Sequence, residues 1–534
     1  EQAERLAQEY ARVSTVVECS ELYFNYYADV PGPVPYQSRL EIDPSEIDIG
    51  NGGPPPQYGI HLIFKQGIVH YGPWTDQQRS SMQNYFFPNS YRDLEKTNPL
   101  QYGLPRVHTE LKMFIQLDKD ITIRVPFRES SKNWKYTAAN NGAYYGARSP
   151  RPYGWIDFKS SGFYIDLSVP LVVGENGYAT MVDVRCQDLE IATSTNYAAM
   201  LQSQSFHIHC VLQNPLIWNQ IRTWVFDLNF EKTKLYLLRD QVTLMQDMIK
   251  DWTAGPSVDF VHFVPIEYIY KMIFNELEIN LYVNEHNIIN DPSDLDDNAI
   301  LSLSMSRLDA AIITPFGKFE PKTNNIEFSV NVQKISASLS LPTSHTASAF
   351  LPKKTQNIGA IKGFVIDGNY EYYTKIDPTH LDTLTMNLKA VKPNLQISGL
   401  LVKYVMIVKD NYLGAFNNFV TFEEYRSRID SSYDRVEQVN AQHRAKNPEN
   451  PYEVFIRLLV EDVILKLPEN LYACEDFLEV YIQELQVENR ATDFYQDLYA
   501  TTSPVFLTKG EPGAVALSKQ KISRIYKDRQ KCWR

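Results

Sequence analysis

Apolar and polar side chains alternate along many short segments of this chain. In one clear example, Phe163, Ile165, Leu167 and Val169 are separated by polar or amphipathic residues. The same alternation recurs at 224–231, 277–283, 326–332, 454–460, 463–467 and 478–482. A period of two with one apolar side is the pattern of a strand that buries one face. The chain is therefore predicted to be mostly β, with antiparallel strands.

Helical patterns are few by comparison. Between Val242 and Trp252 the apolar residues recur at helical spacing, and Gly255 follows as a stop signal. The segment 426–442 has a very polar helical pattern. The segment 398–412 is apolar and fits either a helix or a strand. There are thus many strands with one apolar face and few amphipathic helices to cover them.

Two arrangements can protect these apolar faces. The strands can pack sheet on sheet, as in a β-sandwich, which is the commoner solution. Alternatively the face stays open and an apolar ligand fills it. The pattern leaves both open. Under the second arrangement, the predicted groove-lining residues are Phe163, Ile165, Leu167, Val169, Phe206, Ile208, Trp224, Phe226, Leu228, Phe230, Leu277, Ile279, Leu281, Val283, Phe328, Val330, Val332, Ile456, Leu458, Val460, Val463, Leu465, Val480 and Ile482.

Length, charge and cysteine usage narrow the function classes. The 534 residues exceed one compact core, which implies several domains or one elongated repetitive body. The net charge of −12 argues against a protein that coats nucleic acid. The five cysteines are widely spaced without a CxxC motif, which favours a reducing compartment and no zinc site. No run approaches the roughly 18 apolar residues that a membrane span requires.

Candidate catalytic and metal-binding patterns are weak. His207 and His209 share one side of a predicted strand, but a zinc site needs a third ligand and none stands out nearby. The Asp294-x-Asp296-x-Asn298 pattern lacks the glycine and glutamate of a calcium loop. No nucleophile elbow, Walker A or dinucleotide motif occurs. A hydrolase with a carboxylate pair from distant strands remains a formal alternative.

The segment HYGPWTDQQRSSMQNYFFP, residues 70–88, contains a recognisable motif. A strand leads into Tyr71, Gly72, Pro73 and Trp74, and a short polar run leads to Arg79. Four further recognisable segments follow in order along the chain: PRVHTELKMFIQL, VPLVVGENGYAT, PLIWNQIRTWVFDLNF and VKDNYLGAFNNFVTFEEY. Over about residues 57–505 the chain resembles the Tweek-type bridge-like lipid transfer proteins, the repeating-β-groove family, and in particular its fungal cold-sensitive-for-fermentation branch. It resembles a portion near the amino-terminal end of those longer proteins.

The resemblance implies a fold and a function. Units of about five strands and a crossing loop would join into one elongated, curled antiparallel sheet, whose apolar inner face forms a groove. The groove would carry glycerophospholipid between a donor and an acceptor membrane at contact sites of the endoplasmic reticulum with plasma membrane or mitochondria. It would supply phosphatidylethanolamine for GPI-anchor synthesis, with adaptor proteins at the endoplasmic reticulum. Neither catalytic residues nor a cofactor are expected, since the bound phospholipids are cargo.

The expected organisation follows from the patterns and the resemblance together. The family's amino-terminal membrane span is not visible in this sequence, so an anchor would lie outside it. The basic segment 511–534 fits a solvated terminal helix or one lying on an anionic membrane surface. The predicted divisions are a helical or linker segment at 1–56, β-groove units at 57–265, 266–425 and 452–510, a polar helical connector at 426–451, and a basic helix at 511–534.

Overall fold

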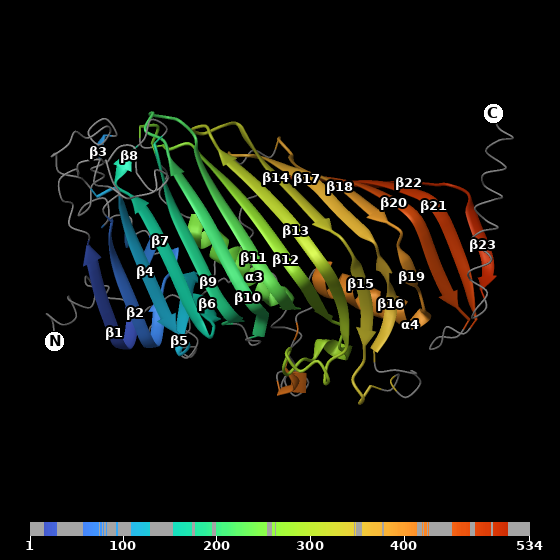
Figure 1. Ribbon diagram of the computed structural model, residues 1–534. Coiled ribbons are helices and arrows are strands. Elements are labelled where there is room, and N and C mark those ends of the chain that lie inside the picture. The colour runs from blue at the N-terminus through green and yellow to red at the C-terminus, as the bar shows by residue number, and fades with distance from the viewer. Residues whose placement is uncertain are drawn as a thin grey trace, which may run out of the picture.

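The computed structural model places the strands in one elongated sheet (Figure 1). It describes residues 15–28, 57–73, 75–76, 78–79, 82, 92–93, 108–128, 153–173, 177–194, 199–253, 259–261, 263–345, 348, 355–375, 379–413, 419, 421–423, 425–426, 451–469, 476–492 and 495–510. The main sheet has 21 strands, and β3 (Arg92–Asp93) and β8 (Val172–Val173) form a separate short parallel pair.

The sheet begins with two long strands at one end. The edge strand β1 (Val17–Ala28) pairs antiparallel with β2 (Gln57–His70). The alternation of Leu22, Phe24 and Tyr26 explains why this segment is a strand. The expectation of a helical or linker segment throughout 1–56 is therefore wrong for residues 17–28. Residues 1–14 and 29–56 lie outside the described residues.

Two groups of five rungs follow, where a rung is one long strand or two short strands in line. The first group consists of β4 (Glu110–Asp118) with β5 (Ile121–Arg128), β7 (Gly162–Pro170) with β6 (Tyr153–Lys159), β9 (Tyr178–Thr193), β10 (Ala199–Asn214) and β11 (Arg222–Leu237). The second group consists of β12 (Ile266–Tyr282), β13 (Ile300–Phe316), β14 (Thr323–Val332) with β15 (Ile335–Ser340), β17 (Gly363–Tyr373) with β16 (Thr355–Ile361), and β18 (Asp382–Val391) with β19 (Asn394–Gln396).

A crossing segment follows each group. After β11 comes the helix α3 (Arg239–Thr253), which confirms the helix predicted over 242–252. After β19 comes α4 (Gly399–Val408) with the π-helical turn η7 (Lys409–Leu413), which settles the ambiguous segment 398–412 as helical. The sheet then continues through β20 (Tyr452–Pro468), β21 (Phe477–Thr492), β22 (Gln496–Thr502) and β23 (Val505–Gly510).

The sheet is mixed rather than antiparallel throughout, which corrects the sequence-based expectation. Pairing is parallel at three joints, between β2 and the β4–β5 rung, between β11 and β12, and between the β18–β19 rung and β20. Five antiparallel rungs leave the chain at the edge opposite to its start. The crossing segment returns it to the starting edge, so the next strand must run parallel to the last one. A connection that crosses from one long edge of the sheet to the other thus accompanies each parallel joint.

A continuous line of irregular residues divides the sheet lengthwise. Non-glycine residues with positive φ occur once in several rungs at matching register, and they are Gln66, Asp188, Lys232, Glu276, Lys392 and Asp462, with φ between 47° and 57°. On the same line β4 gives way to β5, β14 to β15 and β16 to β17. An extra residue at such a point bends a strand and increases its twist. Each left-handed residue costs on the order of 1 kcal/mol, so the surrounding ladder must impose it.

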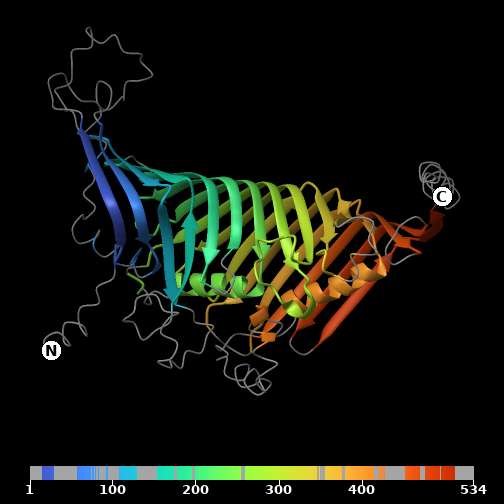
Figure 2. The same cartoon turned by 90° about the horizontal axis from the view of Figure 1, so that it is seen from below.

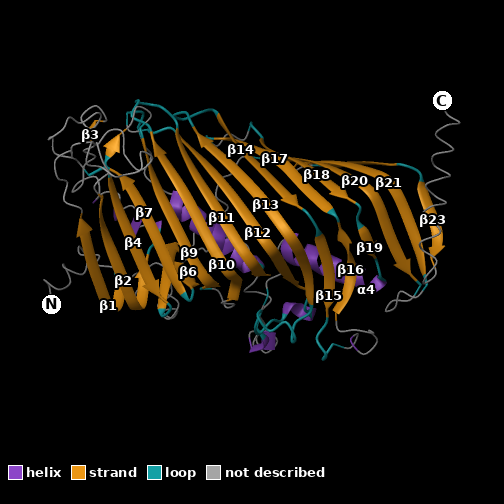
Figure 3. Ribbon diagram, in the orientation of Figure 1, coloured by secondary structure: helices purple, strands orange, loops and turns teal. Residues whose placement is uncertain are grey.

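The bend closes toward the apolar face. Phe206 and Phe230 lie on one side of the line and Leu201 and Leu235 on the other, yet all four belong to one apolar cluster. Seen from below, the sheet curls into a gutter with the helices along one of its sides (Figure 2). The helices lie behind the strands in the orientation of Figure 3. The β-sandwich alternative is excluded for the described residues, because their strands form one continuous sheet.

Several expectations fall on other parts of the chain. Residues 427–442 of the polar segment predicted at 426–442, and the basic segment at 511–534, lie outside the described residues. The proposed domain boundaries stay a prediction, because the described sheet continues through them without a break in pairing. Within the residues that the structure describes, none of the helices has the length and hydropathy needed to cross a bilayer.

Candidate functional site: a continuous apolar groove

The apolar inner face is built from side chains that lie directly opposite one another on successive strands. One row runs unbroken along the sheet, beside the bend. Its members are Leu22, Phe64, Leu117, Phe163, Cys186, Phe206, Phe230, Phe274, Leu308, Val332, Phe364, Ala390, Val460 and Leu485. At about 4.8 Å per strand, these rungs extend over roughly 60 Å. We call this set the midline row.

A second row, two residues away on every strand, is equally apolar. It consists of Phe24, Leu62, Ile115, Ile165, Val184, Ile208, Leu228, Met272, Ala310, Val330, Ile366, Leu388, Leu458 and Val487. Both rows cross the parallel joints without interruption. The apolar surface therefore belongs to the sheet as a whole, and not to its separate units.

The apolar face continues beyond the bend. There the opposed residues are Val17, Val69, Ile123, Phe158, Ile191, Leu201, Leu235, Ile279, Leu303, Ala337, Gly359, Leu395, Leu465 and Val480. Each bulge inserts one residue, so the alternation slips by one position between the two arms. Without that slip these side chains would point to the outer face. The bulges thus keep both arms of the gutter apolar inside.

The residues predicted to line a groove all fall on this inner face. Phe163, Phe206, Phe230, Val332 and Val460 belong to the midline row. The remaining predicted residues lie in the neighbouring rows of the same face, on one side of the bend or the other. Most of these side chains are only half-buried, which is less than a closed core would give them. Their contact with lipid stays a prediction.

The outer face has the opposite character. Arg185 pairs with Asp166, Lys271 lies 3.8 Å from Asp227, and similar exposed pairs recur along the sheet. Exposed ion pairs of this kind contribute little to stability, on the order of 0–1 kcal/mol. Their charges keep the outer face hydrated, so the sheet has only one apolar face.

The predicted histidine pair lies on this outer face. His207 Nε2 and His209 Nδ1 lie 2.9 and 3.2 Å from one carboxylate oxygen of Asp183. Burial by itself would raise the pKa of Asp183, but the two histidine hydrogen bonds outweigh it and hold that pKa below its usual value. Among the described residues no group of three potential ligands has metal-binding geometry. The arrangement is a surface hydrogen-bond cluster.

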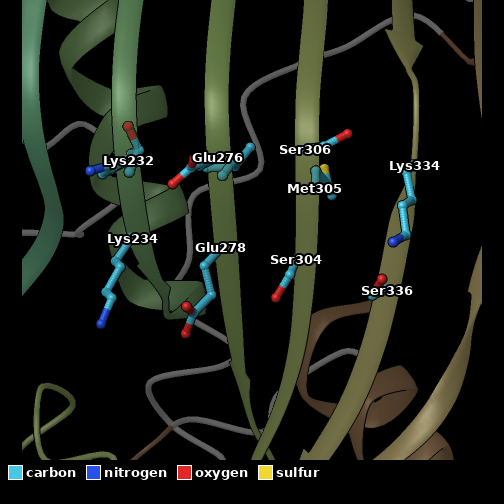
Figure 4. A pocket seen from close by; sticks show the side chains of 11 residues that line it. Lys232, Lys234, Glu276, Glu278, Ser304, Met305, Ser306, Lys334 and Ser336 are labelled. Atoms are coloured by element: carbon cyan, nitrogen blue, oxygen red, sulfur yellow. The ribbon is translucent and has the colours of Figure 1, made fainter.

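A recess of about 430 Å³ also opens on the outer face, over β11, β12, β13 and β15. Figure 4 shows Lys232 and Lys234 on one strand beside Glu276 and Glu278 on the next, with the helices behind the ribbon. The two carboxylates are neighbours on one strand and face lysines. This is the arrangement of a solvated charged surface, and it offers no opposed carboxylate pair for glycoside hydrolysis.

The motif at residues 71–79 begins the connection that follows β2. The Tyr71 hydroxyl bonds to Asp76, and Arg79 lies 3.2 Å from that hydroxyl and 2.9 Å from Asp76. Burial, followed by the Asp76 contact, raises the pKa of Tyr71. Gly72 passes so close to β5 that a Cβ there would lie 2.2 Å from the Pro126 carbonyl oxygen. The motif is thus structural, and Trp74 lies outside the described residues.

The helices pack on the apolar face near one of its long sides. Leu244 of α3 contacts Phe127 and Ile156, and Asp251 forms a 2.6 Å ion pair with Arg128 at the end of β5. The ring centroids of Trp252 and Tyr71 lie 6.4 Å apart, so α3 also contacts the motif at residues 71–79.

In α4, Leu401 and Tyr404 are buried against Leu339 and Leu341. Both helices therefore cover only part of the inner face, and the rows described above run past them.

Sequence reasoning missed half of the inner face. It did not single out Phe64, Cys186, Phe274 and Leu308, although each continues the midline row. A signal for the bend was also present. In β20 the apolar positions step from Val460 to Val463, a gap of three where two is the rule. Similar slips separate other segments, and a slip repeated in successive strands predicts a bend that keeps one face apolar.

Comparisons with known proteins agree with this architecture. The family model described as the Csf1 N-terminal region matches residues 4–445. Protein CSF1 of Saccharomyces cerevisiae is 28% identical over 526 residues, covering 92% of this chain and 18% of the relative. Protein CSF1 of Eremothecium gossypii is 24% identical over 539 residues, covering 94% and 18%.

An animal protein is also similar. Bridge-like lipid transfer protein family member 1 of Homo sapiens is 27% identical over 333 residues, covering 62% of this chain and 6% of the relative. This chain therefore spans less than a fifth of the length of the relatives that it matches.

Proposed function

Because this chain belongs to the family of Csf1 N-terminal regions, we propose that its groove binds phospholipids by their acyl chains and conducts them along the sheet. The observation that carries this proposal is the unbroken apolar row from β1 to β21, which passes three parallel joints without a polar side chain. A storage pocket would need a closed end. A row that continues from rung to rung instead suits movement along one direction.

The energetics favour passive sliding. Each CH₂ transferred from water to an apolar surface gains roughly 0.8 kcal/mol, so an acyl chain of about 16 carbons would cost about 13 kcal/mol to expose. In the groove that cost is largely avoided, and each step along the midline row exchanges one apolar contact for another. The headgroup stays at the open side of the gutter in water. Transport of this kind requires no bond making and no catalytic residue, so the protein is proposed not to be an enzyme.

We extend the proposal to the cellular role. The name of the animal relative, bridge-like lipid transfer protein, supports bulk non-vesicular transfer between two membranes. The resemblance of the sequence to that family supports phosphatidylethanolamine as one cargo, for GPI-anchor synthesis. It also supports a place on the cytosolic side of the endoplasmic reticulum, at contact sites, with adaptor proteins and with an anchor outside this sequence. No cofactor is proposed, since the lipids are the only ligands required.

Lipid content tests the proposal directly. The chain would be purified without detergent and extracted with organic solvent, and phospholipid per chain would be counted by mass spectrometry. Several phospholipids of mixed headgroup are expected. The variant Leu228→Asp plus Ile279→Asp places a carboxylate on each arm of the inner face and should abolish occupancy, because a charge in an acyl environment is strongly disfavoured.

A matched control separates groove loss from misfolding. Asn229→Asp plus Ser336→Asp adds the same charge to the outer face of the same region and should keep full lipid content. Circular dichroism must show the same strand content in both variants. Absence of lipid from the unmodified chain, or equal lipid content in both variants, would contradict the proposal.

A further inference from the structure

An exposed apolar patch lies on one long edge of the sheet, at the strand ends farthest from the start of α3 (Figure 1). The connection between β10 and β11 exposes Leu216, Ile217 and Trp218 by 56, 68 and 67%. The segment that leads into β12 exposes Phe260 and Val261 by 57 and 70%. We call these five residues the rim patch. Side chains this large and this exposed are unusual unless the surface binds something.

The rim patch is organised by aromatic contacts. The Trp218 and Phe260 rings lie 6.2 Å apart, edge to face. Phe260 in turn lies 5.6 Å from Phe319, in the connection between β13 and β14, and Phe319 lies 5.6 Å from Phe263. Three connections that are far apart in sequence thus meet through their aromatic rings. The patch is a preformed surface, and not three independent loop tips.

Aromatic side chains of the inner face continue toward the rim. Tyr268 lies 6.0 Å from Phe316, at the end of β13, and 5.8 Å from Trp224. Tyr268 also lies 6.3 Å from Tyr270, which stacks 4.9 Å from Phe226. Phe226 belongs to the inner face. The aromatic rings of the inner face therefore extend to Phe316 at the end of β13, in the strand that leads directly into the connection of Phe319.

The charges of the rim are balanced. The described parts of the three connections carry two cations and two anions, and these are Lys318, Lys322, Asp259 and Glu320. The chain as a whole has a net charge of −12, which on balance opposes its approach to anionic lipid. The charges of the three connections cancel, so the rim itself adds nothing to that repulsion. A rim without net charge is suited to contact with a membrane surface.

We infer that the rim patch inserts into the interfacial layer of a phospholipid bilayer and lets acyl chains pass over the edge into the groove. This inference rests on the proposed function. Tryptophan and phenylalanine at loop tips are the side chains that settle at the boundary between headgroups and acyl chains. A protein partner would need only the patch, whereas a lipid also needs the apolar inner face behind it. The aromatic rings that extend toward the rim select the bilayer as the occupant.

Vesicle flotation tests the inference. The probe is a vesicle of phosphatidylcholine and phosphatidylethanolamine, mixed with the full chain after its own lipid has been counted. The variant Ile217→Glu, Trp218→Glu, Val261→Glu should lower the vesicle-bound fraction at least tenfold and slow extraction of a fluorescent phospholipid by a similar factor. Its content of co-purified lipid and its melting temperature should stay unchanged, since all three side chains are exposed.

The control places the same charges on exposed residues of the outer face. Tyr164, Met181 and Tyr499 are exposed by 52, 47 and 62%, and their replacement by Glu should leave flotation and extraction unchanged. Equal flotation of the rim variant and the unmodified chain would overturn the inference. So would an unmodified chain that carries lipid but never floats, and in that case the proposed groove function would stand. Absence of lipid from the chain would contradict the proposed function itself.

Discussion

The two five-rung groups share one sheet but fill its inner face differently. In the first group the midline row consists of Leu117, Phe163, Cys186, Phe206 and Phe230. In the second group the same row consists of Phe274, Leu308, Val332, Phe364 and Ala390. The backbone plan is repeated, but the first group carries three phenylalanines, two of them with ring centroids 4.6 Å apart, and the second carries two. The groove therefore requires apolar side chains in the midline row, and not particular residues.

The crossing helices α3 and α4 differ in how they are attached to the sheet. α3 buries polar side chains, with Gln241 and Asp247 exposed by only 1 and 2%, and it is tied to β5 by the pair of Asp251 and Arg128. α4 is apolar along nearly its whole length and is held by Leu401 and Tyr404. The first helix is thus positioned by polar bonds that fix its orientation, and the second mainly by apolar burial. Changes in each group should reveal this difference.

The largest expected effect concerns the thiols of the first group. Burial in the groove raises the pKa of Cys186 to about 12 from an ordinary value of 9.0. Below pH 9 the thiolate fraction of Cys186 should therefore be about a thousandfold lower than that of an ordinary thiol. Its alkylation rate should be lower by the same factor, because the thiolate is the nucleophile. Because the pKa is raised, the rate should increase tenfold per pH unit between pH 9 and pH 11.

Peptide mapping after iodoacetamide treatment measures these rates, and Cys19 of the edge strand is the internal reference. Cys210, whose pKa burial raises to about 11, should react faster than Cys186. Equal rates for Cys19 and Cys186 at pH 8 would show that water enters the midline row freely.

Removal of the anchor of α4 should have the next largest effect. Tyr404 is fully buried, and its hydroxyl lies 3.1 Å from His345 Nε2. Tyr404→Ala should lower the free energy of unfolding by about 3–5 kcal/mol, as large-to-small changes of buried aromatic residues do. Urea denaturation measures it. The exposed neighbour Val405 provides the control, since Val405→Ala should cost well under 1 kcal/mol. Similar losses for both would mean that α4 does not pack as described.

A glycine of the second group should show a smaller effect. Gly368 lies opposite Phe328, and a Cβ there would meet the ring at 2.4 Å and the Thr385 carbonyl oxygen at 2.6 Å. Gly368→Ala should therefore destabilise the sheet by about 1–3 kcal/mol, because overpacking forces neighbours to move. Gly363→Ala is the matched change, since nothing lies within 4 Å of its Cβ position. A thermal melt in which both variants behave alike would contradict the described packing.

The smallest effect is expected for the polar attachment of α3. Asp251→Asn removes half of the ion pair with Arg128 but keeps its shape. The Arg128 side chain is half exposed, so the loss should be only about 1 kcal/mol. A double-mutant cycle with Arg128→Gln, followed by urea denaturation, isolates the coupling energy. A coupling energy of zero would show that this ion pair contributes nothing to the attachment of α3.

Sequence patterns predicted much of this molecule. The alternation from Phe163 to Val169 predicted strand β7 and its inner side, and the apolar spacing from Val242 to Trp252 predicted α3. The motif beginning at Tyr71 indicated the family. Strand β1 was missed, although its alternating Leu22 and Phe24 carried the same signal. Such local signals work because each side chain's face depends only on its position in a strand.

Other features could not be predicted from local patterns. Whether a face with period two meets a second sheet or stays open depends on where distant strands pair, and alternation is the same in both cases. The parallel joint between β11 and β12 depends on the segment with α3, which returns the chain to the edge where β11 began. The rim patch depends on three connections meeting at one edge, since neither Trp218 nor Phe319 is informative without the other.

The sequence by itself determined which side chains are apolar, on which side of each strand they lie, and where the alternation slips. Those properties are local, because backbone geometry sets the direction of each side chain. Only the tertiary structure decided that the slips align across the sheet, that the bend closes toward the apolar side and that the rows join into one groove. These properties arise from register between strands that are far apart in sequence, and register is set by the pairing of the whole sheet.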